Sequence, residues 1–156
     1  MKRASEGQLG AALRSMDMET FVYKPPDDAR NPKPADYLVW FLADPDQMEL
    51  MRDYEFAFVE AKDTDAVEVF NLREIRPSQR RTASIAQELG IPYWLCIYWR
   101  RRSKWTISSA RMILSLKDAK SLTYLALSTL YGVDCTPGQL TATMRSALMG
   151  ELFAKE

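Results

Sequence analysis

The sequence predicts an α/β fold, in which a central mixed β-sheet is flanked by helices and followed by a helical C-terminal extension. Three observations support this prediction. The periodic segments run in the order helix, strands, helix, strand. The most apolar run, residues 91–99, is typical of a buried central strand. The 156 residues, 47% of them hydrophobic, are enough to enclose one core. We expect a core over 1–110 and the extension over 111–156, within the same compact domain or as a dimer element.

The first half is predicted to hold one helix and four strands. Ser5 is a suitable N-cap for a short helix over 6–15, in which Leu9 and Leu13 lie on one face. Strands are expected over 19–24, 35–43, 54–62 and 67–72. A loop rich in Pro and Asp, residues 25–34, separates the first two, and the connection 44–53 has room for one helical turn.

The second half is predicted to begin with a helix whose two ends are marked by proline and glycine. This helix should begin at Ser78, directly after Pro77, and end at Gly90. The strand 91–99 follows, with Trp94, Cys96 and Trp99 as core residues. A basic turn then leads to an edge strand over 105–107. From residue 111 the pattern is helical: a Leu-rich stretch over 114–130 indicates a covering helix or dimer face, and a last helix begins at 136–137.

The composition excludes several classes of site. The chain has no histidine, and its two cysteines, Cys96 and Cys135, have no metal-type spacing. His-dependent triads and His-based metal sites are therefore excluded, and catalysis must use carboxylates, Lys, Tyr, Arg or a hard metal ion. We expect a cytoplasmic protein, because no signal peptide is recognisable and the longest apolar run is far too short to span a bilayer.

The formal net charge of zero conceals a segregation of charge along the chain. Residues 1–70 hold 8 basic and 15 acidic residues, whereas residues 71–111 hold 9 basic and 2 acidic ones. This asymmetry indicates a polyanionic partner facing the middle of the chain. The basic residues expected to contact nucleic acid are Arg73, Arg76, Arg80, Arg81, Arg100, Arg101, Arg102 and Lys104. Solvation of a strand end is the alternative role for the run at 100–104.

Asp36, Glu60 and Lys62 form the constellation that could carry chemistry. Asp36 opens one expected strand, and Glu60 and Lys62 close the next one, on the same face. If these strands pair as a hairpin, the three side chains converge at one edge of the sheet. Two carboxylates brought together there repel each other unless a cation lies between them. Oxygen ligands without His or Cys fit Mg²⁺ or Mn²⁺, with the Ala61 carbonyl as an available third ligand.

Together with the two carboxylates, Lys62 provides the functional groups that metal-assisted phosphodiester hydrolysis requires. Beside a metal-bound water, its ammonium could assist deprotonation or stabilise the charge that develops on a phosphate. The alternative is that Glu60 and Lys62 form an exposed ion pair without function.

The motif "PAD" at residues 34–36, followed by "EAK" at residues 60–62, resembles the PD-(D/E)XK nuclease motif. Together with "FVEAKDT", the following short strand and "IRPSQRRTASIAQELGIPYWLCIYW", residues 5–108 resemble Holliday junction resolvases of the RecU/Hjc type. The resemblance implies a restriction-endonuclease-like core, in which Asp36 and Glu60 bind the metal and Lys62 is catalytic. It also implies that Glu6 on the first helix and Gln79 on the helix after the fourth strand face the site. Without the resemblance, Glu6 is an ordinary first-turn acid and Gln79 an ordinary surface residue.

We therefore expect a Mg²⁺-dependent, structure-specific DNA endonuclease without an organic cofactor. We expect it to act as a homodimer that cuts four-way junctions. Another PD-(D/E)XK DNA nuclease of repair or restriction type is one alternative. A nucleic-acid-binding protein that keeps the fold without activity is the other.

Overall fold

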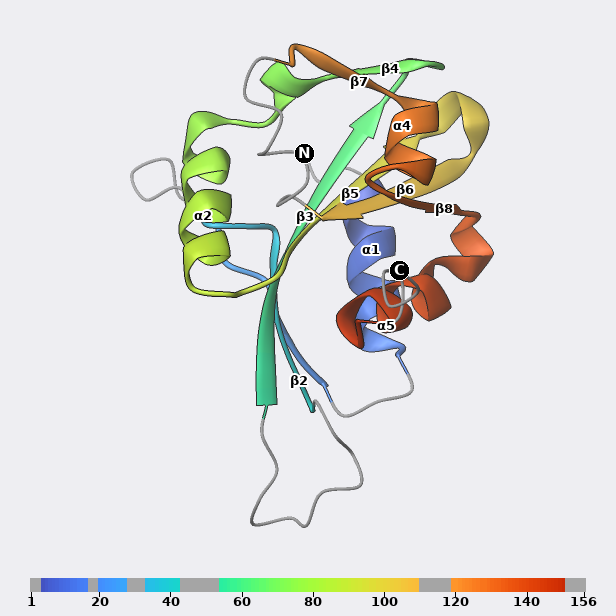
Figure 1. The fold of residues 1–156 in the computed structure, drawn as a ribbon. Coiled ribbons are helices and arrows are strands. Elements are labelled where there is room, and N and C mark those ends of the chain that lie inside the picture. Colours follow the sequence, from blue (N-terminus) through green and yellow to red (C-terminus); the bar gives the residue numbers. More distant parts are fainter. Residues whose placement is uncertain (1–3, 17–19, 28–32, 43–53, 110–118, 151–156) are drawn as a thin grey trace.

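The computed structural model describes residues 4–16, 20–27, 33–42, 54–109 and 119–150. Within these ranges, six strands form a mixed sheet in the order β1-β2-β3-β5-β6-β8 (Figure 1). Its strands are β1 (Thr20–Tyr23), β2 (Tyr37–Leu42), β3 (Tyr54–Thr64), β5 (Tyr93–Trp99), β6 (Lys104–Ser109) and β8 (Gly132–Cys135). Only β3 and β5 pair in parallel; the other neighbours are antiparallel. The structure confirms the predicted class, a mixed sheet flanked by helices.

Helices cover both faces of this sheet. On one face, α1 (Ala4–Arg14) and α5 (Leu140–Leu148) pack over the strands, as Figure 1 shows. Their apolar side chains, among them Leu9, Leu13 and Met144, join Val39 and Cys96 in the larger core cluster. The prediction that Leu9 and Leu13 share a buried face is therefore confirmed, since both are fully buried.

The opposite face is covered by α2 (Pro77–Glu88) and by a small second sheet. This sheet pairs β4 (Val69–Asn71) with β7 (Ser121–Thr123), and α4 (Tyr124–Thr129) follows it directly. Short 3-10 turns occur at Leu72–Glu74, Arg100–Arg102 and Pro137–Gln139. Phe70, Trp99 and Leu127 lie in the core cluster below this sheet.

The predicted elements of the first 100 residues occur close to their expected positions. The expected helix over 6–15 is α1, the helix from Ser78 to Gly90 is α2, and β5 lies inside the sheet as predicted for the most apolar run. The core assignment of Trp94, Cys96 and Trp99 is also confirmed. The expected strand over 67–72 exists as β4, in the small sheet. The connection 44–53 lies outside the described residues.

Two expectations for the C-terminal third are wrong. The strand expected at 105–107 is not an edge strand, because β8 pairs with its outer side. The segment after residue 111 is not helical throughout: it contains β7 and β8 besides α4 and α5. The physical reason is that β7 and β8 are only three and four residues long, too short to show a strand period, and are fixed by their partners. The predicted final helix is present as a 3-10 turn followed by α5.

No helix in the described ranges combines the length and the apolar character that crossing a bilayer requires.

Candidate functional site

The β2–β3 hairpin brings the two predicted carboxylates together. Its antiparallel register pairs Tyr37 with Val59, so Asp36, one residue before β2, lies opposite Glu60. Both side chains are buried, with 7% and 3% of the residue surface exposed, respectively. The predicted convergence at one edge of the hairpin is therefore present in the fold.

Reciprocal hydrogen bonds lock Asp36 and Glu60 to each other's strand. The Asp36 backbone N–H donates to Glu60 Oε2 at 3.1 Å, and the Ala61 backbone N–H donates to Asp36 Oδ2 at 2.9 Å. Each carboxylate thus satisfies a backbone donor that a short strand end would otherwise leave unpaired. The positions of the two acids are consequently set by the backbone as well as by packing.

Gln79 contacts the same carboxylate from α2. Its Nε2 donates to Glu60 Oε1 at 2.6 Å, while its Oε1 accepts from the Arg76 backbone N–H at 2.9 Å, at the start of the helix. One side chain therefore caps the N-terminus of α2 and fixes the rotamer of Glu60. Gln79 is buried, which favours the role implied by the resemblance over that of an ordinary surface residue.

Lys62 lies beside Glu60 on the same face of β3, as its spacing predicts. Its Nζ is 3.6 Å from Glu60 Oε1, and both side chains are buried rather than exposed. Burial, and then the neighbouring Asp36 carboxylate, raise the pKa of Glu60 above its ordinary value of 4.5, although the Lys62 ammonium lowers it. This environment disfavours the charged form of Glu60 and would favour a further cation.

Glu6 reaches the rim of the site from α1. Its side chain is mostly buried, and Lys24 Nζ lies 2.8 Å from its Oε1. The Tyr37 hydroxyl donates to the Glu6 backbone carbonyl at 2.7 Å and ties this first turn to β2. The ion pair with Glu6 raises the pKa of Lys24, although burial opposes this effect. The structure thus brings Glu6 close to the other predicted residues, but with its own counter-ion.

Lys33 and Asp27 line the site and were missed by the sequence prediction, as was Tyr93, which supports the site from β5 without lining it. Lys33 Nζ lies 3.0 Å from Asp36 Oδ1 and 2.8 Å from Asp27 Oδ1. The Tyr93 hydroxyl, on β5, donates to the Pro34 carbonyl at 3.0 Å and holds the segment that leads into Asp36. Lys33 could have been found from its place three residues before Asp36, whereas nothing local marks Tyr93.

These residues surround a pocket of about 150 Å³. It is lined by Glu6, Asp27, Lys33, Asp36, Glu60, Ala61, Lys62, Arg76 and Gln79. Within the described ranges, no three Asp, Glu, His or Cys side chains are grouped closely enough to form a complete metal site. The donor set nevertheless fits a hard divalent ion, because Mg²⁺ typically takes one or two carboxylates and keeps several waters. Asp36 and Glu60 would supply those two carboxylates.

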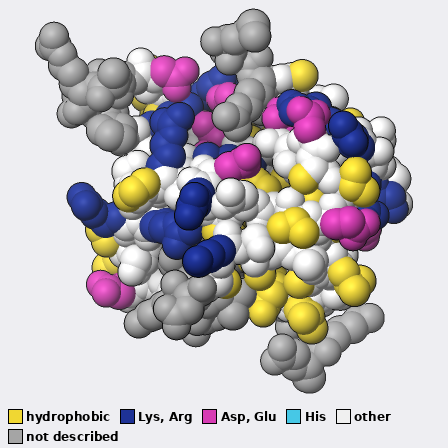
Figure 2. All heavy atoms as spheres, turned by 90° about the horizontal axis from the view of Figure 1, so that it is seen from above, with side chains coloured by type: hydrophobic (Ala, Val, Ile, Leu, Met, Phe, Trp, Pro, Cys, Tyr) yellow, Lys and Arg dark blue, Asp and Glu magenta, His cyan; other side chains and the backbone are white. Residues whose placement is uncertain are grey.

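The predicted nucleic-acid contacts fall into two groups. Arg100 pairs with Asp63 and Asp65, Arg102 pairs with Glu68, and Lys104 lies 3.8 Å from Asp134. Arg80 donates to the Leu72 carbonyl. By contrast, four of the predicted residues are exposed and form no ion pair with another described residue: Arg73, Arg76, Arg81 and Arg101. In Figure 2, Lys and Arg side chains gather on the side where α2 lies, with acidic side chains beside them.

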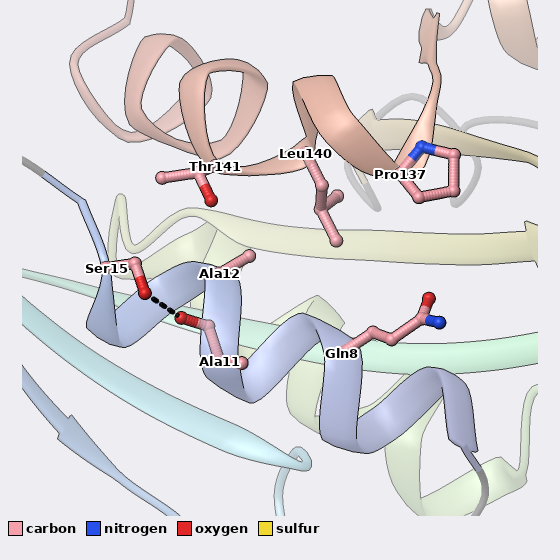
Figure 3. Close-up of a pocket in the computed structure, with 7 residues that line it drawn as sticks. All are labelled: Gln8, Ala11, Ala12, Ser15, Pro137, Leu140 and Thr141. Atoms are coloured by element: carbon pink, nitrogen blue, oxygen red, sulfur yellow. Dashed lines mark hydrogen bonds between the residues drawn. The ribbon is translucent and has the colours of Figure 1, made fainter.

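A second hollow, of about 330 Å³, lies between α1 and the start of α5 (Figure 3). Its lining is Gln8, Ala11, Ala12, Ser15, Pro137, Leu140 and Thr141, and the Ser15 hydroxyl is bound to the Ala11 carbonyl at 2.7 Å. None of these side chains is ionisable, so this hollow offers no general acid, general base or carboxylate ligand. The smaller pocket around Asp36 is the better candidate.

The sequence matches no model of a known protein family and no curated protein.

Proposed function

We propose that this chain is a divalent-metal-dependent DNA endonuclease of the PD-(D/E)XK type. The observation that carries the proposal is the meeting of Asp36, Glu60, Lys62 and Gln79 around one small pocket. These residues come from the hairpin and the helix from which the resemblance implies them. A buried pair of carboxylates next to a buried ammonium is also difficult to explain as a stabilising device, because burying charge is costly.

Each side chain has a defined part in the proposed reaction. Asp36 and Glu60 would hold Mg²⁺ or Mn²⁺, which when bound supplies positive charge for the phosphate and lowers the pKa of an attacking water. The Lys62 ammonium, next to Glu60, is placed to stabilise negative charge that develops on the phosphate. Gln79 is a positioning residue, since it contacts Glu60 through its amide and fixes the carboxylate.

The direct test is cleavage of labelled DNA by the full chain. A four-way junction with an immobile crossover and a linear duplex of matched sequence are incubated with Mg²⁺, with Mn²⁺ and with EDTA. Asp36→Asn and Lys62→Ala should reduce cleavage by two orders of magnitude or more, roughly the loss of one electrostatic contact in a transition state. Binding measured in Ca²⁺ should remain within a few-fold for Lys62→Ala.

Matched controls come from the surface of the same molecule. Glu88→Gln at the end of α2 and Lys120→Ala before β7 remove the same charges at exposed positions outside the pocket. Both should cleave at the wild-type rate. Cleavage that persists in EDTA or in Asp36→Asn would refute the proposal.

Within this activity, we infer that the substrate is a four-way DNA junction and that the protein acts as a homodimer. Resolving a junction needs two symmetric cuts, and a two-fold dimer supplies two such sites. Paired symmetric nicks in the junction alone, together with a dimer mass in light scattering, would support this inference. Equal cutting of the duplex would instead indicate a general nuclease.

One observation favours an inactive protein as the second candidate. Lysines already accompany three of the carboxylates in the pocket: Lys24 lies at Glu6, Lys33 at Asp36 and Lys62 at Glu60. A site balanced in this way can persist without any metal. DNA binding that needs no metal, with no cleavage of either substrate, would establish this candidate.

A further inference from the structure

Lys33 occupies a particular position in the candidate site. Its ammonium lies 3.0 Å from Asp36 Oδ1, 2.8 Å from Asp27 Oδ1 and 3.9 Å from Glu6 Oε1. Asp36 is buried, and its other oxygen, Oδ2, already accepts the Ala61 backbone N–H. Lys33 therefore neutralises the oxygen of Asp36 that the β-sheet leaves available.

The same oxygen is the one that is more available to a metal ion. Oδ2 is held by the Ala61 N–H, so an ion that uses Asp36 most directly would bind at Oδ1. An ammonium and a divalent ion on one oxygen would be only a few ångströms apart. Two cations at that separation repel strongly in a partly buried site. Lys33 and a metal ion would thus compete for Asp36 Oδ1.

Asp27 gives the ammonium a second partner outside the buried pair. The Asp27 side chain is 82% exposed, whereas that of Asp36 is 10% exposed. Lys33 is joined to its backbone by a flexible four-carbon stem, so it could leave Asp36 while it keeps Asp27. Burial lowers the pKa of Lys33, but Asp27 and Asp36 outweigh this effect and raise it, so the side chain is a cation at neutral pH.

We propose that Lys33 is a built-in counter-ion of the candidate metal site, which a divalent cation must displace from Asp36 in order to bind. The inference rests on the proposed function, because it assumes that Asp36 is a metal ligand. It assigns to Lys33 a role in setting the metal affinity: the ammonium stabilises the metal-free site and weakens binding of the ion. The free energy that separates Lys33 from Asp36 is subtracted from the binding free energy of the metal.

The test is calorimetric titration of Mn²⁺ into the full chain at neutral pH and constant ionic strength. Lys33→Gln removes the charge and should tighten Mn²⁺ binding roughly tenfold or more, as expected for one partly buried charge contact. Lys33→Arg keeps the charge and can form a bidentate ion pair with the carboxylate. The Mn²⁺ affinity of this variant should therefore equal that of the wild type or be weaker. Arg at this position also preserves the ion pairs if Lys33→Gln fails to fold.

Lys24→Gln is the matched control. It removes one lysine charge from the same pocket region, but its ammonium pairs with Glu6 at 2.8 Å rather than with Asp36. Its effect on the Mn²⁺ affinity should stay within about threefold, because only longer-range repulsion is lost.

The outcomes separate this inference from the proposed function. If the wild type binds Mn²⁺ and Lys33→Gln binds it equally or more weakly, the inference is overturned while the metal site stands. Tighter binding by Lys33→Arg would overturn it as well. If neither the wild type nor Lys33→Gln binds Mn²⁺, and Asp36→Asn changes nothing, the metal site fails and Lys33 is only a structural ion pair.

Discussion

Replacing Gln79 tests whether α2 and the acidic pair form one unit. Gln79→Ala removes two hydrogen bonds at once: the donation to Glu60 Oε1 and the acceptance from the Arg76 N–H. A hydrogen bond to a charged or partly charged acceptor contributes about 1.5–3 kcal/mol to the free energy of unfolding. Loss of the helix cap costs about 0.5–1 kcal/mol more. We therefore expect Gln79→Ala to lower the free energy of unfolding by roughly 2–4 kcal/mol.

Gln79→Glu separates the two bonds. The carboxylate can still accept the Arg76 N–H, but it cannot donate to Glu60 unless it is protonated. The variant should therefore be most destabilised at pH 9, above the raised pKa of Glu60, where two carboxylates face each other, and should recover much of the loss at pH 5, where one of them holds a proton. The loss in Gln79→Ala should change much less between these two pH values.

Urea unfolding followed by the fluorescence of the four tryptophans gives both free energies, with each variant compared with the wild type at the same pH. Coincident transitions by fluorescence and circular dichroism would support a two-state comparison. A loss below about 0.5 kcal/mol in Gln79→Ala would refute the reasoning, because it would mean that neither hydrogen bond contributes in solution.

Three further predictions concern pH, helix packing and DNA binding. The folded-state pKa of Glu60 is raised above its ordinary value, so the protonated Glu60 stabilises the metal-free folded protein at pH values below that ordinary value, and this stabilisation is lost as the pH rises through the folded-state pKa. Glu60→Gln should lack this loss. Urea midpoints of the wild type and of Glu60→Gln that run parallel from pH 5 to 9 would contradict the prediction. A Cβ at Gly10 would overlap the Tyr37 hydroxyl and lie 2.8 Å from Tyr37 Cζ, so Gly10→Ala should lower the unfolding free energy by about 1–3 kcal/mol. Gly7→Ala, with no atom within 4 Å of the added group, should raise it by roughly 0.5–1 kcal/mol, and equal thermal shifts in the two variants would argue against close packing of α1 on Tyr37. Under the proposed function, alanine at Arg73, Arg76 or Arg81 should each reduce the salt dependence of DNA binding by about one unit of the slope of log K against log salt concentration. Arg100→Ala should reduce it by less, because the charge of Arg100 is already paired with Asp63 and Asp65. Fluorescence anisotropy at several salt concentrations measures these slopes, and an equal change for Arg100→Ala would contradict the distinction.

The hairpin was predictable because its signals are local. The alternation of apolar residues fixed which face of β3 carries Glu60 and Lys62, and the polar loop before Asp36 fixed where β2 begins. The position of Gln79 in the first turn of α2 was also predictable from local signals, because Pro77 marks the start of this helix. The contact of Gln79 with Glu60 was not, since it depends on how α2 packs against β3.

The C-terminal third shows the opposite case. The four residues of β8 carry no period that separates a strand from a loop, and they become a strand because β6 offers an unpaired edge. The pairing of Arg100 with Asp63 and Asp65 was equally hidden, because the partners are more than 30 residues apart. In the sequence Arg100 is part of a basic segment, whereas in the fold its charge is paired with two carboxylates.

The sequence by itself determined the chemistry that this protein can use: without histidine, its candidate site consists of carboxylates, lysines, an arginine and an amide. It also determined that Asp36, Glu60 and Lys62 could share one edge of a hairpin, because strand geometry repeats every two residues. Only the tertiary structure decided that these groups are buried and that Gln79 reaches Glu60. The physical reason is that burial and charge compensation depend on contacts between segments that are distant in the sequence. These contacts form only when the whole chain packs.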